Sequence, residues 1–339
     1  MAMTTDTHPP SPDLFFDTVQ AYQRTAALRA AIELGLFTAI ADGAHTVPAL
    51  AAKCQTSERG TRILCDFLTI VGFLTKSGAS YQLTQDSAVF LNAHSPAYMG
   101  GTMAFLGSAD VVRHFDDLAN TVRRGSIPKD DSTVADDNPV WEKFARAMVP
   151  MMMPSAQAIA EILGVAAAGP IKVLDIAAGH GIFGIALAQR NPEAEVVAVD
   201  WAGVLKVATE HAVKMGVGAR HHGVAGDAFT VDWGTGYDIA LMTNFLHHFD
   251  TATCVTLLKK VAVSLKSGGR VAVLEFVPND DRVSPPATAM FAMQMLGNTP
   301  AGDAYTLAEL TAMLKAAGFN TVSGHPLQGP QTVVVAAKT

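Results

Sequence analysis

The chain has 339 residues, about twice the length of a usual single domain, which predicts two domains or one domain with a large addition. A hydrophobic content of 49% against 16% charged residues excludes an intrinsically disordered chain. The net charge of −7 argues against general attraction to nucleic acid phosphates. Three widely spaced cysteines form neither a disulfide framework nor a metal knuckle, so we expect a reducing, cytoplasmic location.

The hydrophobicity of the chain is not explained by a targeting or membrane segment. Residues 1–13 are polar and hold three prolines, unlike a signal or transit peptide. No apolar run reaches the roughly 18–20 residues that a membrane-spanning helix needs. The mean hydropathy of +0.24 and the use of 14 methionines against five tyrosines leave two explanations open. One is a large core shared between subunits, and the other is an apolar ligand pocket.

The first part of the chain is expected to be a small, mostly helical domain. Apolar residues recur three and four apart over residues 14–41, which predicts helices. A short helix capped by Thr46 and a helix over about 56–71 follow. Two short strands are then expected at 72–76 and 81–84. Helices followed by a hairpin in this order indicate a winged helix.

We place the boundaries of the parts at changes in this pattern. Residues 1–95 form the first domain, and residues 96–165 form a mostly helical connection that lines a substrate pocket. Within that connection, residues 141–153 are expected to form one apolar helix. Residues 166–339 form the second domain.

The second domain alternates strands with helices. Strands are expected at 171–176, 195–200, 239–242, 270–276 and 331–338, and helices at 182–189, 205–215, 253–265 and 307–317. Strands that alternate with helices of about ten to fifteen residues predict an α/β domain. Its sheet should be mostly parallel and covered by helices on both faces.

A glycine-rich turn joins the first of these strands to its helix. Gly179 and Gly181 let the backbone approach a ligand closely, and the helix start supplies free N–H groups. The spacing from Gly179 to Gly184 also fits the G-x-G-x-x-G dinucleotide fingerprint. A nicotinamide-dependent oxidoreductase is therefore an alternative at this point.

Three acidic residues bear on the ligand of this turn. Asp175 lies on the strand, where it is poorly placed for a pyrophosphate but well placed to orient a loop that holds an amino acid moiety. Asp200 ends the next strand, where a carboxylate can accept both ribose hydroxyls of a dinucleotide or of S-adenosylmethionine. Asp227 can accept from an adenine amino group while Phe229 packs on the ring. For each carboxylate, a helix cap or a solvated strand end is the plainer alternative.

The C-terminal half resembles the class I S-adenosylmethionine-dependent methyltransferases. From about Phe15 onward, the whole chain resembles the O-methyltransferases that carry an N-terminal winged-helix dimerisation domain, a family of plant phenolic and bacterial natural-product enzymes of secondary metabolism. The segments that carry the resemblance are residues 31–37, 173–181, 226–229, 244–250 and 271–276. The resemblance implies a Rossmann-like sheet, S-adenosylmethionine as cofactor with S-adenosylhomocysteine as product, no metal, and an intertwined homodimer.

The resemblance also implies roles for individual residues. His247 falls on the catalytic histidine, and Glu275 falls on the first of two carboxylates that orient it. Cofactor-binding positions are Asp175, Gly179, Gly181, Asp200, Trp201, Gly226, Asp227, Ala228, Phe229, Asn244 and Met152. Acceptor-binding positions are Phe144, Met148, Met151 and Met295.

Two of these assignments also have a chemical basis in the residue types. Methyl transfer to a hydroxyl requires that the acceptor, the methyl group and the sulfur are held in line and that a proton is removed. Histidine is the natural general base for a phenol because free imidazole titrates near neutrality, which makes His247 a candidate. Thioethers adapt to flat apolar ligands, although plain core packing explains the methionines equally well.

The chain departs from the family pattern around the expected base. His248 stands where the family usually has Asp, and Phe249 stands where it usually has Trp. Register puts Ala304 at the second orienting carboxylate, with Asp303 one residue away. C-methylation, or transfer to an acceptor that needs little deprotonation, therefore stays open beside O-methylation of a small aromatic hydroxyl.

A winged helix is also a DNA-binding shape, so a transcriptional regulator is a third alternative. Residues 1–150 carry 12 Lys and Arg against 16 Asp and Glu, which gives a net charge of −4. The would-be recognition helix from Arg62 is apolar nearly all round, whereas base reading needs exposed polar side chains. We therefore expect a small-molecule acceptor and a second copy of the chain as partners, and neither nucleic acid nor membrane.

Overall fold

The computed structural model describes residues 9–134 and 137–338. The chain forms two compact units, and the boundary falls between Met103 and Ala104, eight residues after the predicted boundary at 95. The helical residues from Ala104 to 165 belong to the second unit. Among the described residues, no helix is both long and apolar enough to cross a membrane.

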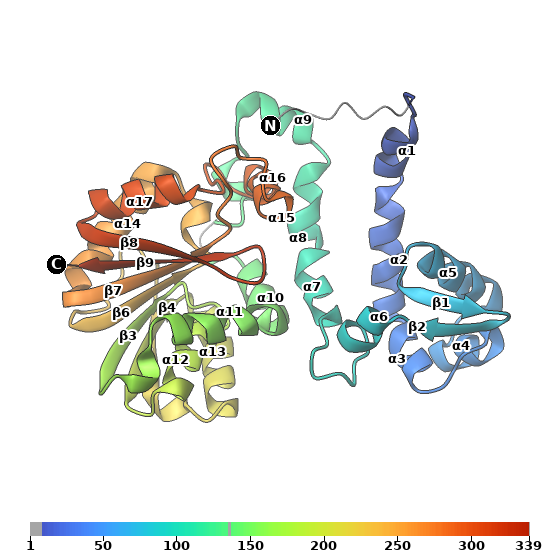
Figure 1. Ribbon diagram of the computed structural model, residues 1–339, viewed down its shortest axis with the longest axis horizontal. Helices are drawn as coiled ribbons and strands as arrows, with labels where there is room; N and C mark the ends of the chain where they lie inside the picture. Colours follow the sequence, from blue (N-terminus) through green and yellow to red (C-terminus); the bar gives the residue numbers. More distant parts are fainter. Residues whose placement is uncertain (1–8, 135–136, 339) are drawn as a thin grey trace. The chain divides into compact units, whose positions relative to one another are not determined.

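The first unit is a set of helices followed by a two-stranded hairpin (Figure 1). Its elements are α1 (Asp13–Val19), α2 (Ala21–Glu33), α3 (Leu36–Ala41), α4 (Val47–Cys54), α5 (Glu58–Ile70), β1 (Leu74–Ser77), β2 (Ser80–Leu83) and α6 (Gln85–Phe90). Gly35 takes a φ of 65° between α2 and α3, and the Ser57 hydroxyl caps α5 by accepting from the Gly60 N–H. The predicted order of helices and hairpin is confirmed.

The unit boundary falls within α7 (Met103–Leu106), from which short helices lead to two longer ones in the second unit. The helices after α7 are α8 (Ala109–Val112), α9 (Leu118–Arg124), α10 (Val140–Ala147) and α11 (Val149–Ile162). The prediction of one helix over 141–153 is wrong, because the helix breaks at Met148 between α10 and α11. Pro150 has no N–H to donate to the preceding turn, so α10 cannot continue through it.

The core of the second unit is a seven-stranded sheet. Its strands are β3 (Ile171–Ile176), β4 (Ala194–Asp200), β5 (His221–Ala225), β6 (Tyr237–Thr243), β7 (Leu265–Glu275), β8 (Phe319–Pro326) and β9 (Thr332–Lys338). The order across the sheet is β5-β4-β3-β6-β7-β9-β8. The five strands from β3 to β7 pair in parallel, whereas β9 is antiparallel to both β7 and β8. The predicted mostly parallel α/β sheet is confirmed.

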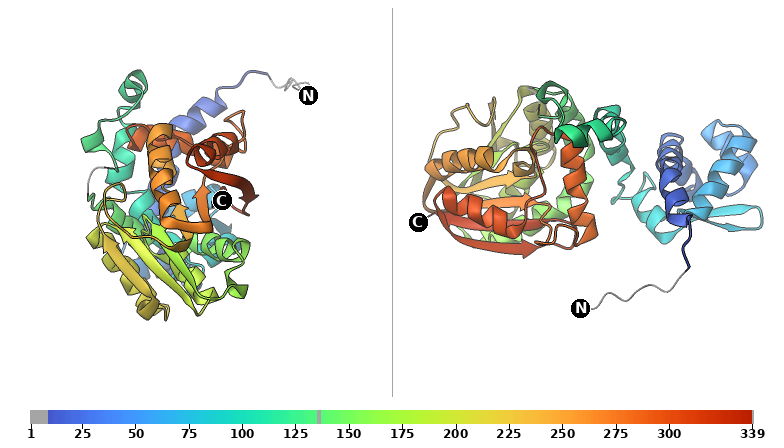
Figure 2. Two further views of the ribbon diagram at one scale, coloured as in Figure 1. Left: turned by 90° about the vertical axis from the view of Figure 1, so that its left-hand side faces the viewer. Right: turned by 90° about the horizontal axis from the view of Figure 1, so that it is seen from above.

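Helices cover both faces of this sheet (Figures 1 and 2). They include α12 (Ile182–Arg190), α13 (Ala202–Lys214), α14 (Thr251–Ser264) and α17 (Leu307–Ala316). The short helices α15 (Pro286–Ala289) and α16 (Phe291–Asn298) follow β7 and pack against each other, and α16 also contacts α9. Successive residues of a strand point to opposite faces of the sheet. Leu174 packs on one face in a core with α14 and α17, and Val173 packs on the other face in a core with α11 and α12. Strands β3 and β6 are buried along most of their length, so a ligand site can form in the loops at their carboxyl ends.

Candidate active site

A cavity of about 680 Å³ lies at the carboxyl ends of β3, β4 and β6. Parallel strands end at one edge of a sheet, so the loops that follow them meet there. The wall is completed by side chains from α10, α11 and α16. These surroundings place strand-end polar groups opposite an apolar helical wall.

The glycine-rich turn after β3 is shaped by close packing. Gly179 and Gly181 have φ values of 57° and 73°, which disfavour side chains. A Cβ on Gly184 would lie 2.7 Å from the Cγ1 atom of Val196, so helix α12 approaches β4 only because this residue is glycine. Gly179 lines the cavity, whereas Gly181 lies behind it and begins α12.

Asp200 at the end of β4 connects this turn to the cavity wall. Its two carboxylate oxygens accept from the Gly179 N–H at 2.8 Å and the Trp201 N–H at 2.7 Å. Burial raises the pKa of Asp200 to about 6. Both Asp200 and Trp201 line the cavity.

Asp175 lies on β3 beneath the turn and does not line the cavity. One of its oxygens accepts from the Gly184 N–H at 3.0 Å, and the other has no partner. Burial, and secondarily the charge of Asp200, raises the pKa of Asp175 to about 7. Asp175 therefore holds the start of α12 through the Gly184 N–H.

The segment after β5 forms another part of the wall. Gly226, Asp227, Ala228 and Phe229 all line the cavity. The Asp227 carboxylate accepts from the Phe229 N–H at 2.9 Å, which fixes the turn. The Phe229 ring packs edge-on against Phe249, with centroids 5.1 Å apart.

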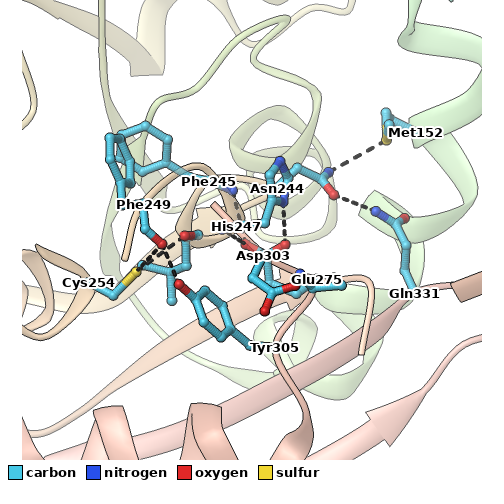
Figure 3. A network of polar contacts seen from close by, with 12 residues as sticks. Met152, Asn244, Phe245, His247, Phe249, Cys254, Glu275, Asp303, Tyr305 and Gln331 are labelled. Carbon is cyan, nitrogen blue, oxygen red and sulfur yellow. Dashed lines mark hydrogen bonds and ion pairs between the residues drawn. The ribbon is translucent and has the colours of Figure 1, made fainter. Parts of the chain in front are cut away.

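His247 lines the cavity after β6 and is paired with a buried carboxylate from β7 (Figure 3). Its Nδ1 atom lies 2.5 Å from Glu275 Oε2. The other oxygen of Glu275 accepts from the backbone N–H groups of Phe245 and His247 at 3.1 and 3.3 Å. This pairing places the proton on Nδ1 and leaves Nε2 as an acceptor. Glu275 itself lies behind the wall, in contact with His247.

Two further contacts fasten the loop that carries His247. The Cys254 thiol donates to the Leu246 carbonyl at 3.2 Å, and the Tyr305 hydroxyl donates to the Phe249 carbonyl (Figure 3). The site histidine is thus held from α14 and from the segment before α17.

The departures from the family pattern have clear structural outcomes. The His248 ring lies 4.3 Å from that of His247, and burial together with this neighbour keeps the pKa of His248 well below its ordinary value. The Asp303 carboxylate pairs with Arg282 at 3.2 Å, and Ala304 is buried. Of the described residues, Glu275 is the one whose carboxylate meets His247.

The apolar wall contains the methionines singled out in the sequence. Met148, Met151, Met152 and Met295 line the cavity together with Phe144. The Sδ atom of Met152 lies 3.7 Å from the Asn244 side-chain nitrogen, and Asn244 also lines the cavity.

Several wall residues had not been singled out from the sequence. They are Phe105, Lys129, Thr133, Trp141, His180, Phe183, Phe245, Phe276, Phe291, Gln294 and Asn298. Most lie on short helices or loops, where periodicity carries little information. His180 stands inside the glycine-rich motif, so its position there was the available signal. Within residues 9–134 and 137–338, no group of three or more His, Cys, Asp or Glu side chains is arranged to hold a metal ion.

Comparisons with known families match both units. Residues 132–320 match the model of an O-methyltransferase domain, and residues 16–93 match an O-methyltransferase dimerisation domain. Together these segments cover most of the chain.

Individual relatives cover nearly the whole length. The chain is 28% identical to the 3-hydroxy-5-methyl-1-naphthoate 3-O-methyltransferase of Streptomyces sahachiroi, over 92% of this chain and 90% of the relative. A crystal structure assigned to the O-methyltransferases, from Nostoc punctiforme, is 51% identical with a TM-score of 0.94 and covers 98% and 100% of the two chains. Human N-acetylserotonin methyltransferase in complex with S-adenosylmethionine shares the fold, at 22% identity, a TM-score of 0.84 and 99% coverage of both chains.

Proposed function

Because this chain belongs to the S-adenosylmethionine-dependent O-methyltransferases that carry a dimerisation domain, we propose that His247 is the general base for a small, largely apolar aromatic hydroxyl acceptor. The bound cofactor supplies a methyl group that is already activated by its sulfonium charge. The chain then has to hold the acceptor in line and remove its proton.

The pairing of His247 with Glu275 is the observation that carries this proposal. With Nδ1 bonded to the carboxylate, Nε2 accepts the hydroxyl proton of the acceptor. The imidazolium that forms is stabilised by the Glu275 carboxylate at Nδ1. A second carboxylate is not required, because Glu275 bonds both to the ring and to the backbone of the same loop.

The residues of the strand-end loops fit the cofactor. Each oxygen of Asp200 accepts one backbone N–H and keeps a lone pair for a ribose hydroxyl. We assign Asp227 and Phe229 to the adenine, and Gly179, Asn244 and Met152 to the amino acid end. Asp175 and Gly181 support the turn from behind.

The acceptor class follows from the helical wall. Phe144, Met148, Met151 and Met295 present apolar, adaptable surface, and Lys129 is the cationic side chain among the described wall residues. A flat aromatic acceptor fits such a wall, and the Streptomyces relative is named for a naphthoate. The first unit is proposed to join two chains into a homodimer.

We expect His247→Ala to lower kcat by about 10²–10⁴-fold, because the general base is lost. Its affinity for S-adenosylhomocysteine, measured by calorimetry, should stay close to that of the wild type. Turnover is measured on a panel of aromatic hydroxyl acceptors, and mass spectrometry with NMR locates the new methyl group.

His248→Ala is the matched control, since it removes the neighbouring imidazole from the same loop. Loss of turnover in His248→Ala with full activity in His247→Ala would show that the base is the other histidine. A product methylated on carbon would reject the hydroxyl as the acceptor atom.

A further inference from the structure

A series of polar side chains begins on α11 at Ser155, passes through the β8–β9 turn to Asn244 in the cavity wall, and returns to α11 at Met152. Figure 3 shows the part from Gln331 through Asn244 to Met152. The Ser155 hydroxyl donates to Gln331 Oε1 at 3.0 Å. Gln331 Nε2 donates to Asn244 Oδ1 at 2.5 Å, and Asn244 Nδ2 lies 3.7 Å from the sulfur of Met152. The series of side chains thus ends on Met152, a residue assigned above to the amino acid end of the cofactor.

The direction of hydrogen-bond donation along this series of side chains is determined by its last member, Met152. A thioether has no proton to donate, so the Asn244 amide meets Met152 with its NH₂ group. The Asn244 side-chain carbonyl then faces Gln331, which must donate to it from its own NH₂ group. Reversing either amide would place two acceptors or two donors face to face.

Asn244 is held in an unusual backbone conformation where β6 leads into the cavity. Its φ is 54°, a left-handed value that asparagine tolerates better than most residues. Its N–H donates to the Leu274 carbonyl at 2.8 Å. With the backbone fixed and the carbonyl used, the second N–H of the side chain is left for a ligand in the cavity.

Gln331 reaches Asn244 only because of the sheet topology. It immediately precedes β9, which lies between β7 and β8, so its side chain crosses to the end of β6. Gln331 is buried, yet it lines a separate hollow of about 560 Å³ rather than the main cavity. Gln331 contacts the main cavity wall directly through its hydrogen bond to Asn244.

We propose that Gln331 is a positioning residue for the methyl-donor site and that Ser155 supports it. Gln331 sets the direction of the Asn244 amide, so that Asn244 presents its second N–H to an acceptor atom at the amino acid end of the cofactor. This inference rests on the cofactor placement proposed above, beside Asn244 and Met152.

The test is calorimetric titration of the full-length chain with S-adenosylhomocysteine. Gln331→Met keeps the length of the side chain and removes its donor, so the Kd is expected to rise about 3- to 10-fold. Gln331→Glu is expected to weaken binding further, because a carboxylate forces the Asn244 amide to turn its NH₂ group away from the cavity. Gln328→Met, an exposed change in the same turn, should leave the Kd unchanged.

A double-mutant cycle separates positioning from general structure. In an Asn244→Ala background, Gln331→Met should have no further effect on the Kd, and the melting temperature without ligand should match that of Asn244→Ala. An equal loss of affinity in both backgrounds, or an unchanged Kd for both Gln331 variants, would overturn the proposal.

The same titrations keep this inference apart from the proposed function. A wild-type chain that does not bind S-adenosylhomocysteine would contradict the function itself. Normal binding by Asn244→Ala would contradict the placement of the cofactor beside Asn244, and with it the role of Gln331.

Discussion

Asp175 and Asp200 occur on neighbouring strands but meet different surroundings. Asp200 bonds to two backbone N–H groups and borders the cavity, whereas Asp175 is fully buried with one oxygen unpartnered. Burial raises both pKa values, to about 6 for Asp200 and about 7 for Asp175. The native state therefore keeps protons that the unfolded chain loses above pH 4.

This difference gives the stability of the protein a pH dependence that Asp175→Asn should reduce. The favourable contribution of the protonated carboxyl is full below pH 3.8 and is lost as the pH rises through about 7. Asparagine keeps an oxygen for the Gly184 N–H and cannot ionise. Relative to the wild type, the free energy of unfolding of the variant should increase by on the order of 2–4 kcal/mol as the pH rises from 5 to 8.

Thermal unfolding of the ligand-free protein at pH 5 and pH 8 measures this effect. Asp86→Asn, an exposed change on α6 in the first unit, serves as the control and should follow the wild type at both pH values. A constant offset between Asp175→Asn and the wild type would show that Asp175 is already ionised at pH 5.

Among single residues, the cofactor side of the cavity was easier to predict than the acceptor side. Gly179 follows a predicted strand and Asp200 ends the next one, and strand ends of a parallel sheet share one edge. Asp227 was singled out from its motif before β6, although the strand that precedes it, β5, was not predicted. Phe105 and Asn298 come from segments that only tertiary packing brings to the cavity. Asp303 was a candidate second carboxylate, but its ion pair with Arg282 directs it elsewhere.

At the scale of elements, α17 shows how a local signal fixes a boundary. The Thr306 hydroxyl accepts from the Glu309 N–H at 3.3 Å, and the Glu309 carboxylate accepts from the Thr306 N–H at 2.9 Å. This reciprocal pair is a capping box. It starts the helix that packs with α14 over one face of the sheet.

Thr306→Ala should therefore destabilise the second unit by about 1–2 kcal/mol, because the Glu309 N–H loses the hydroxyl that caps it. The measurement is urea unfolding followed by circular dichroism. Thr256→Ala, an exposed change inside α14, is the control and should stay within about 0.5 kcal/mol. Equal stability of Thr306→Ala and the wild type would show that the cap does not contribute.

Elements were predictable where both faces are buried and harder to predict at the edges. Strand β6 contains the continuous apolar run 239–242 and β3 is mostly apolar, so their positions were clear. Strand β5 carries His222 and Gly223 in exposed positions, and β8 is a mostly polar edge strand, so neither showed a pattern. The break between α10 and α11 depended on one residue, Pro150, whose missing N–H outweighed the apolar periodicity.

At the scale of the whole molecule, the first unit exposes an unusual amount of apolar surface. Large apolar side chains on α1 and α2 include Leu14 at 80%, Phe15 at 64%, Val19 at 55% and Tyr22 at 68% exposure. Contiguous exposed apolar residues mark interaction surfaces, and this segment overlaps the dimerisation domain. It accounts for part of the positive mean hydropathy of the chain.

The double variant Leu14→Asp/Val19→Asp is therefore expected to convert a dimer into a monomer, since two charges would have to be buried unpaired. Sedimentation velocity of the full-length chain gives the mass in solution. Val263→Asp, at a 74% exposed position on α14, should leave the dimer intact. A dimer that survives the double change would place the interface elsewhere.

The methionine side chains in the wall also make the cavity sensitive to oxidation. Hydrogen peroxide converts a thioether into a polar sulfoxide, which would spoil an apolar surface built from Met148, Met151 and Met295. Exposed Met290 should oxidise first without loss of activity, and S-adenosylhomocysteine should slow the later inactivation; peptide mass spectrometry alongside activity checks both. Activity lost in step with Met290 oxidation would contradict this. The same thioethers that adapt to flat acceptors thus make the ligand-free enzyme sensitive to oxidants. A ligand bound in the cavity should protect them from oxidation.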